Sequence, residues 1–168
     1  MSMFSRLMPA TAGAVGLFTV GACATWATAS APDSFAGLAG RWAGHGTVLP
    51  AAGPGEAFKC VVTYLPDGDS SRLKQNLRCK SENYRLDAST HLQLDGSVVT
   101  GRWQDNIYTG LNGTVSGTLT ASGFDILLSG RFFKAKMAVE GSRCEQQVRV
   151  VPDRADYIRE VSASLKKC

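Results

Sequence analysis

The sequence is poor in histidine, in charge and in long apolar runs, and each shortage excludes a class of protein. Only 2 of its 168 residues are histidine, which leaves little room for a histidine-rich metal site. Hydrophobic residues make up 44% and charged residues 19%, so the chain is neither disordered nor collagen-like. No uncharged run poor in glycine and proline reaches the roughly 20 residues of a lasting membrane helix. Glycine is abundant, with 18 residues in a chain of about one domain's length, as in a protein of many tight turns.

The N-terminus has the residue order of an export signal. Arg6 is the single charge among residues 1–29, a mostly apolar stretch follows from 7 to 20, and small residues come next. We therefore predict a signal peptide over 1–29 and a single exported domain over 30–168, located in the periplasm.

Two endings of this signal remain open. Ala27-Thr28-Ala29 fits an ordinary cleavage site, and so does Ala22-Cys23-Ala24. Val20-Gly21-Ala22-Cys23 resembles a bacterial lipobox, in which Cys23 becomes the lipidated first residue of an outer-membrane-anchored lipoprotein. In the second case the lipid anchor is the only membrane contact that the sequence predicts.

The basic excess is too small to predict a nucleic-acid partner. The chain has 18 basic and 14 acidic side chains, an ordinary balance for a soluble domain. Lys74, Arg78 and Lys80 line one side of a predicted strand, and we interpret them as a solvated face.

Two segments in the first half of the chain alternate apolar and polar residues, as half-buried antiparallel strands do. One face carries Phe58, Cys60, Val62, Tyr64, Leu73, Gln75, Leu77 and Cys79. A hairpin that turns about Asp69 and Ser70 sets Cys60 opposite Cys79. Val62 then lies opposite Leu77, and Tyr64 lies opposite Gln75. Because this register puts both cysteines on one face, it predicts a Cys60–Cys79 disulfide in an oxidising compartment.

The next hairpin is predicted to turn at Asp95-Gly96, a two-residue turn of the kind that needs positive φ. This register sets Leu92 opposite Val99, Thr90 opposite Gly101 and Ala88 opposite Trp103. Further alternating segments follow as far as residue 150.

The strand count favours a closed sheet. The last segment, 153–167, fits either a helix capped at Asp153 or a closing strand, and we favour the strand. Eight to ten short strands in consecutive hairpins then predict an all-β, antiparallel up-and-down barrel, because closure removes exposed sheet edges. A β-sandwich is the alternative.

Gly40 and Trp42 form a G-x-W motif, and Gly101-Arg102-Trp103 repeats it. The first motif resembles the opening of lipocalin-like (calycin-type) barrels, in which the tryptophan closes the barrel's bottom and a late arginine packs across it. That resemblance gives Arg149 or Arg159 the arginine's part. With the two hairpin cysteines, the chain also resembles a group of small exported proteins of Gram-negative bacteria, which implies export and a barrel but no established activity.

A second resemblance is to periplasmic protease inhibitors. These proteins also begin with A-G-x-W, here Ala39–Trp42, and carry two cysteines about twenty residues apart. The match ends after Cys79, and the later motifs of that family are not recognisable.

No arrangement of residues predicts catalysis. His45 and His91 alternate onto outer faces of different strands, and most aspartates stand at turns. Cys60 and Cys79 lack the C-x-x-C spacing of zinc sites. We therefore expect no enzyme activity, no metal and no cofactor.

Cys144 and Cys168 remain as a second predicted disulfide pair. A simple hairpin that turns near Arg154 sets Cys168 about four residues out of register with Cys144, which exceeds the reach of a disulfide at roughly 3.3 Å per residue. A bulge, a terminal helix or a curling tail would remove the conflict.

The predicted inner face is where a binding site would lie. It carries Trp42, Tyr64, Trp103 and Phe133, which we predict to line a site for a small apolar ligand. Its small residues would either leave a cavity or let a small barrel coil tightly around a dry core. The alternatives to a ligand-binding envelope protein are a protein-binding module, such as a periplasmic hydrolase or protease inhibitor, and a structural envelope protein.

Overall fold

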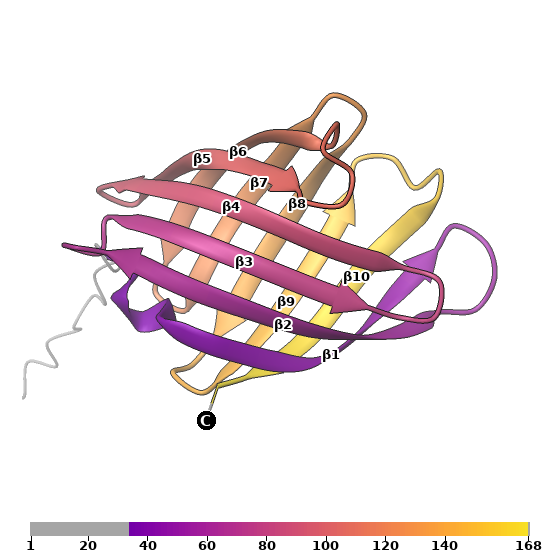
Figure 1. Cartoon of the computed structure of the whole chain (residues 1–168), viewed down its shortest axis with the longest axis horizontal. Coiled ribbons are helices and arrows are strands. Elements are labelled where there is room, and N and C mark those ends of the chain that lie inside the picture. The colour runs from indigo at the N-terminus through magenta and orange to yellow at the C-terminus, as the bar shows by residue number, and fades with distance from the viewer. Residues whose placement is uncertain (1–33, 168) are drawn as a thin grey trace, which may run out of the picture.

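The computed structural model describes residues 34–167 (Figure 1). The predicted signal peptide, its cleavage site, Cys23 and Cys168 lie outside the described residues. A short 3-10 helix, η1 (Ala36–Leu38), precedes the strands. The strands are β1 (Gly40–Pro50), β2 (Glu56–Asp67), β3 (Arg72–Lys80), β4 (Arg85–Asp95), β5 (Val98–Asp105), β6 (Asn112–Thr120), β7 (Gly123–Gly130), β8 (Lys134–Gly141), β9 (Glu145–Pro152) and β10 (Ile158–Lys166). None of the helices in this range is long and apolar enough to span a membrane.

The strands form one closed antiparallel barrel. Each strand pairs with the next along the chain, and β1 closes the sheet by pairing with β10, where Gly44 lies opposite Leu165. The predicted all-β up-and-down barrel is therefore confirmed, and the β-sandwich is excluded. The closing strand predicted within 153–167 is β10.

The register of the first hairpin is confirmed at all three predicted pairs. Cys60 lies opposite Cys79, Val62 opposite Leu77 and Tyr64 opposite Gln75. The two cysteines form a disulfide whose Cα atoms are 4.1 Å apart. The bridge therefore joins β2 and β3 directly across the ladder.

The predicted register of the β4–β5 hairpin is wrong by two residues. Leu94, not Leu92, lies opposite Val99, and Thr90 lies opposite Trp103. The reason is the turn, which consists of Gly96 and Ser97, with Gly96 at a φ of +58° in the first turn position. A shift of two keeps every side chain on its predicted face but changes its partner.

Inner glycines bring strands together and leave space for aromatic rings. Gly46 lies opposite Phe58, and Gly113 lies opposite Trp103. A Cβ atom at Gly46 would clash with the Phe58 ring, and one at Gly113 would clash with the carbonyl oxygen of Ser129 and with the Trp103 indole. At these positions the missing side chains therefore leave no void.

The barrel has two different ends. The η1 end carries η1 and the connections 68–71, 96–97, 121–122 and 142–144, whereas the loop end carries the connections 51–55, 81–84, 106–111, 131–133 and 153–157. Figure 1 shows η1 beside the β2–β3 turn at one side and the β1–β2 loop at the opposite side.

We expect the variant Cys60→Ala/Cys79→Ala to lose roughly 3 kcal/mol of the free energy of unfolding, because the bridge closes a loop of about 18 residues in the unfolded chain. Urea denaturation of the purified, unreduced protein measures the loss. The control Lys59→Ala/Lys80→Ala changes the adjacent outward-facing pair and is expected to leave stability nearly unchanged. Thiols at 60 and 79 that react with an alkylating agent in the folded, unreduced protein would contradict the prediction.

Candidate functional site

The η1 end of the barrel is closed by a buried tryptophan. Trp42 has no exposed surface, and its Nε1 donates a hydrogen bond of 2.8 Å to the carbonyl oxygen of Leu38 in η1. The Tyr64 ring meets it edge to face, with ring centroids 6.5 Å apart. Phe35, also fully buried, donates its backbone N–H to Ser70 in the β2–β3 turn. The N-terminal segment of the domain is thus fixed across this end.

The cation over Trp42 is a lysine and not one of the two predicted arginines. Lys167 Nζ lies 4.8 Å from the centroid of the Trp42 ring and donates a hydrogen bond of 3.0 Å to the carbonyl oxygen of Ala39. Arg149 instead binds Glu160 at 2.7 Å, and Arg159 donates to the carbonyl oxygen of Pro50. Both arginines are exposed on the outer surface.

The inner face becomes more accessible toward the loop end on three strands. Leu73, Phe124 and Leu165 are buried near the η1 end of β3, β7 and β10. Farther along the same strands, the inward-facing side chains are half-buried: Cys79, Leu128 and Val161. On these three strands the inner face is therefore less completely covered toward the loop end than at the η1 end.

The four predicted ligand-lining residues separate into two pairs. Trp42 and Tyr64 pack together in the closed part of the core. Trp103 is half-buried and meets the Phe133 ring edge to face at 5.7 Å, and Phe133 is exposed at the loop end. Of the four side chains, only Trp103 and Phe133 lie toward the loop end and are accessible there.

One inner row carries polar side chains, and one of them has a buried polar atom without a hydrogen-bond partner. Tyr64, Gln75, Thr90 and Trp103 lie opposite one another on β2 to β5. Gln75 is buried, and burial raises the pKa of the Tyr64 hydroxyl above its ordinary value. Trp103 Nε1 is also buried without a partner. Because an unpaired polar group inside a protein is costly, this row is suited to a polar atom of a bound molecule or to water.

A cavity of about 430 Å³ lies on β2 to β4 near the loop end. Its walls include the outward-facing cations Lys59, Arg78, Lys80 and Arg85, together with the disulfide, Leu86 and Ile107. Asp87, which binds Arg78 at 3.1 Å, is the one acidic residue that lines it. None of the four predicted ligand-lining residues contributes to this cavity.

Neither histidine stands in a catalytic arrangement. His45 and His91 are both exposed. His91 lines a second cavity of about 220 Å³ with Ser89, Arg102 and Trp103, but no carboxylate lines that cavity. Among residues 34–167, no cluster of three or more potential ligands could hold a metal ion.

The second predicted disulfide remains a prediction. Cys144 is disulfide-bonded, and Cys168 lies outside the described residues. The β9–β10 hairpin sets Glu145 opposite Lys166, and Lys167 donates its backbone N–H to the carbonyl oxygen of Cys144. The expected misalignment of about four residues is therefore absent, because the hairpin turns one to two residues later than Arg154.

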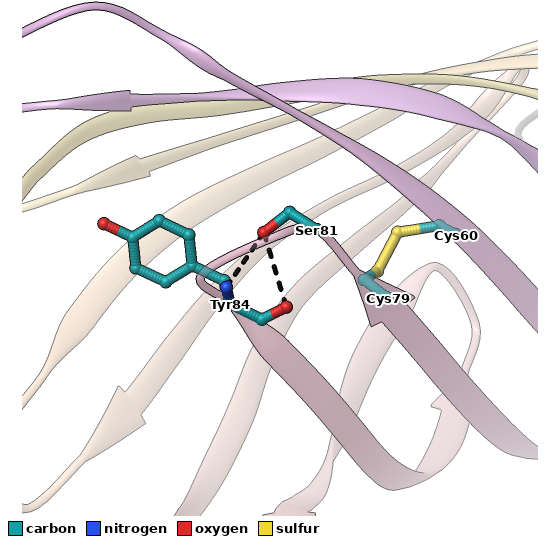
Figure 2. The surroundings of a disulfide bond; sticks show 4 residues. All are labelled: Cys60, Cys79, Ser81 and Tyr84. Atoms are coloured by element: carbon teal, nitrogen blue, oxygen red, sulfur yellow. Dashed lines mark hydrogen bonds between the residues drawn. A yellow bond between two sulfur atoms is a disulfide. The ribbon is translucent and has the colours of Figure 1, made fainter.

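The β3–β4 loop at the open end is anchored by side-chain hydrogen bonds. Ser81 Oγ accepts the backbone N–H of Tyr84 at 2.9 Å, and Ser81 follows the disulfide residue Cys79 by two positions (Figure 2). Asn83 donates its backbone N–H and its side-chain Nδ2 to the two carboxylate oxygens of Glu56, at 2.8 and 3.0 Å. The hydrogen bonds from Ser81 and Asn83 hold the pKa of Glu56 below its ordinary value.

We expect Lys167→Met to lower the free energy of unfolding by about 1–2 kcal/mol, because it removes the cation over Trp42 and a hydrogen bond but keeps an apolar stem. The neighbouring variant Lys166→Met removes only an exposed ion pair with Glu145 and is expected to stay close to the unchanged protein. Urea denaturation compares them. Equal stabilities of the two variants would show that Lys167 does not hold the η1 end.

The anchoring by Glu56 is expected to fail only in acid. Since its pKa is lowered in the folded protein, the carboxylate keeps its hydrogen bonds at neutral pH and loses them as the pH falls through a value below 4.5. The amide chemical shift of Asn83 should follow this titration. Glu56→Gln should abolish the titration, and Glu82→Gln in the same loop should preserve it. A midpoint above 4.5 would contradict the prediction.

No protein-family model matches the sequence, and no curated protein matches it either. Among solved structures, the fold is similar to that of Rv2717c from M. tuberculosis, with a TM-score of 0.64 and 12% identity over 79% of this chain and 94% of that one. It is also similar to the S-type phycobiliprotein lyase CPES from Guillardia theta, with a TM-score of 0.52 and 12% identity over 78% and 88% of the two chains. Both are lipocalin-like calycin barrels, and at this identity the likeness shows that the described chain has a lipocalin-like fold.

Proposed function

We propose that the chain is an exported cell-envelope protein that binds a small apolar ligand through the loop end of its barrel. The observation that carries this proposal is the difference between the two ends of the interior. Trp42 and η1 close one end, whereas inward-facing apolar side chains are partly exposed at the other: Leu77, Trp103, Leu128, Met137 and Val161. A ligand that covers these side chains would remove apolar surface from water, which favours binding by about 25 cal/mol per Å².

The polar inner row supports a ligand that is not purely hydrocarbon. Thr90 can donate or accept a hydrogen bond, Trp103 Nε1 can donate one, and neither side chain is charged. An ionised group would have no counter-charge in this row and would be costly to bury. We therefore expect the ligand to combine an apolar body with a neutral polar group, such as a carbonyl or a hydroxyl.

The proposed role is binding rather than catalysis. Among residues 34–167, the groups that could act as nucleophile, base and orienting residue do not converge, since His91 lies beside Ser89 without a carboxylate at the same cavity. The similarity in fold to a phycobiliprotein lyase leaves this proposal unchanged, because function depends on the site and not on the fold.

Two leucines that are adjacent in β7 provide a matched test. Leu128 faces inward and lies opposite Val115 and Ala135, whereas Leu127 faces outward between Ser116 and Lys136. We expect Leu128→Trp to fill the open part of the interior and to weaken binding of the fluorescent apolar probe N-phenyl-1-naphthylamine by about tenfold or more. Leu127→Trp should bind the probe as the unchanged protein does.

Native mass spectrometry identifies the natural ligand. Protein purified from its own periplasm should carry an apolar adduct that lipid extraction removes. Return of the extracted molecule should quench tryptophan fluorescence, and Trp103→Phe should reduce that quenching. Equal probe affinities of the two leucine variants, or an absent adduct together with no probe binding, would overturn the proposal.

A further inference from the structure

Exposed apolar side chains collect at one end of this molecule. Phe132 is 73% exposed and Tyr157 is 85% exposed, and each stands in a connection at the loop end. Among the exposed large apolar residues of the described chain, only Leu65 and Val98 lie elsewhere. The others form what we call the apolar rim: Tyr84, Leu86, Ile107, Tyr108, Leu111, Phe132, Phe133 and Tyr157. Four different connections and the first residues of β4 contribute to it.

The connections at the η1 end have the opposite character. Residues 68–71 and 96–97 are glycine, aspartate and serine, and 121–122 is Ala-Ser. Both sets of connections are exposed to solvent. If loops simply tolerated apolar residues, both ends of the barrel would carry them, so tolerance does not explain why only the loop end does. Apolar side chains that collect at one end of a molecule favour a contact with another apolar phase at that end.

Cations without ion-pair partners flank the apolar rim. Lys80 and Arg85 stand on the two sides of the 81–84 loop, and Arg131 and Lys134 stand on the two sides of Phe132–Phe133. All four are exposed, and none of them belongs to an ion pair among residues 34–167. Arg131 lies 5.1 Å from the centroid of the Phe132 ring. Each pair therefore couples a positive charge with apolar surface beside it.

Lys80 and Arg85 also belong to a longer basic row. The outward-facing residues His45, Lys59, Lys80 and Arg85 lie opposite one another on β1 to β4. Three of these side chains line the cavity of about 430 Å³, which opens beside the rim residues Leu86 and Ile107. Acidic residues also lie at the loop end. Glu56 and Glu82 stand near this row, Asp87 is paired with Arg78, Asp105 ends β5, and Asp153 and Asp156 lie in the 153–157 connection, away from the row in the strand order.

We propose that the loop end docks on the surface of a bilayer that contains anionic phospholipid. The rim side chains enter the headgroup region, and Lys80, Arg85, Arg131 and Lys134 lie against lipid phosphates. Tyrosine and phenylalanine beside basic residues are the composition of an interfacial membrane contact, because the rings enter the boundary while the charges bind anionic headgroups. This contact is separate from any lipid attached at Cys23, and it does not require a ligand inside the barrel.

The arrangement of the rim favours a bilayer over a protein partner. Four loop tips around a barrel mouth present separate apolar points rather than one continuous patch. A bilayer surface accepts such points without shape complementarity, whereas a stable protein interface needs a packed core. The bare cations match the negative charge of anionic headgroups.

The test is co-sedimentation with vesicles. The full chain carries Cys23→Ser, so that no acyl chain is attached, and it is purified from an exporting host with its N-terminus fixed by intact mass. We expect binding to vesicles of phosphatidylcholine and phosphatidylglycerol, and much weaker binding to phosphatidylcholine alone. Phe132→Ser/Tyr157→Ser should lower the partition coefficient by about tenfold or more. Lys80→Glu/Arg85→Glu should lower the partition coefficient by about fivefold or more per residue, and high salt should remove the effect of these two charge changes.

Matched variants at the η1 end control for general stickiness and charge. The control for apolar surface is Leu65→Ser/Val98→Ser, because these two side chains are 48% and 51% exposed. The control for charge is Lys74→Glu/Arg143→Glu. Both double variants should bind vesicles as the unchanged chain does. A tryptophan introduced by Tyr157→Trp should be quenched by brominated phospholipid, and one introduced by Val98→Trp should not.

Three results would overturn the proposal. The first is an equal loss of vesicle binding in the rim variants and the control variants. The second is quenching of a tryptophan at residue 98 but not at residue 157. The third is that this chain binds no vesicles, while a second copy of the chain or another protein covers the rim. N-phenyl-1-naphthylamine binding, measured without vesicles, is expected to be unchanged in Phe132→Ser/Tyr157→Ser. Failure of probe binding with intact vesicle docking would therefore reject only the interior site, and the reverse result would reject only the docking.

Discussion

Pairing of β1 with β10 closes the sheet, and the packing at the η1 end follows from that closure. It removes both free edges, which would otherwise offer unpaired N–H and C=O groups to other chains. It also brings the end of β10 beside the start of β1, so that Lys167 reaches both the Trp42 ring and the Ala39 carbonyl. η1 supplies the acceptor for the indole from the other side. Trp42 is therefore held by both ends of the described chain, and opening the β1–β10 ladder would expose it.

The two barrel ends perform different physical tasks because they are built differently. The η1 end excludes water with buried aromatic rings and has short polar turns. The loop end keeps inward-facing apolar residues partly accessible and surrounds them with exposed apolar side chains. If both proposals hold, the mouth of the barrel faces the bilayer, and an apolar molecule passes between lipid and interior with little exposure to water. The membrane contact would then lower the barrier to ligand exchange without any change in the interior.

Sequence patterns predicted the faces of the strands better than their partners. The β2–β3 register was predictable because one alignment alone set two cysteines and most apolar residues on the same face. In the β4–β5 hairpin, a turn at Asp95-Gly96 and a turn at Gly96-Ser97 both keep the apolar residues on the inner face. Only the backbone conformation of the turn distinguishes the two registers. The cation over Trp42 was missed for a similar reason. Arg149 and Arg159 have the residue type that lipocalin-like barrels use over this tryptophan, but alternation already places Arg149 on the outer face, opposite Ser162. Lys167, the residue that follows β10, is the cation that lies at the η1 end.

The apolar rim shows that the order of residues along the sequence can distinguish the two ends of the barrel. In an up-and-down barrel, every second connection lies at the same end, so the connections form two sets that alternate along the chain. Tyr84, Ile107-Tyr108, Phe132-Phe133 and Tyr157 stand in one set, and glycine, serine and aspartate predominate in the other. Considered singly, each is an ordinary exposed side chain. Considered with the topology, they recur at alternate connections, and a barrel with apolar loops at one end follows once the strands are counted correctly. The accessibility of the interior could not be inferred in this way, because it depends on how far Trp103 and Phe133 close the mouth, which only side-chain packing decides.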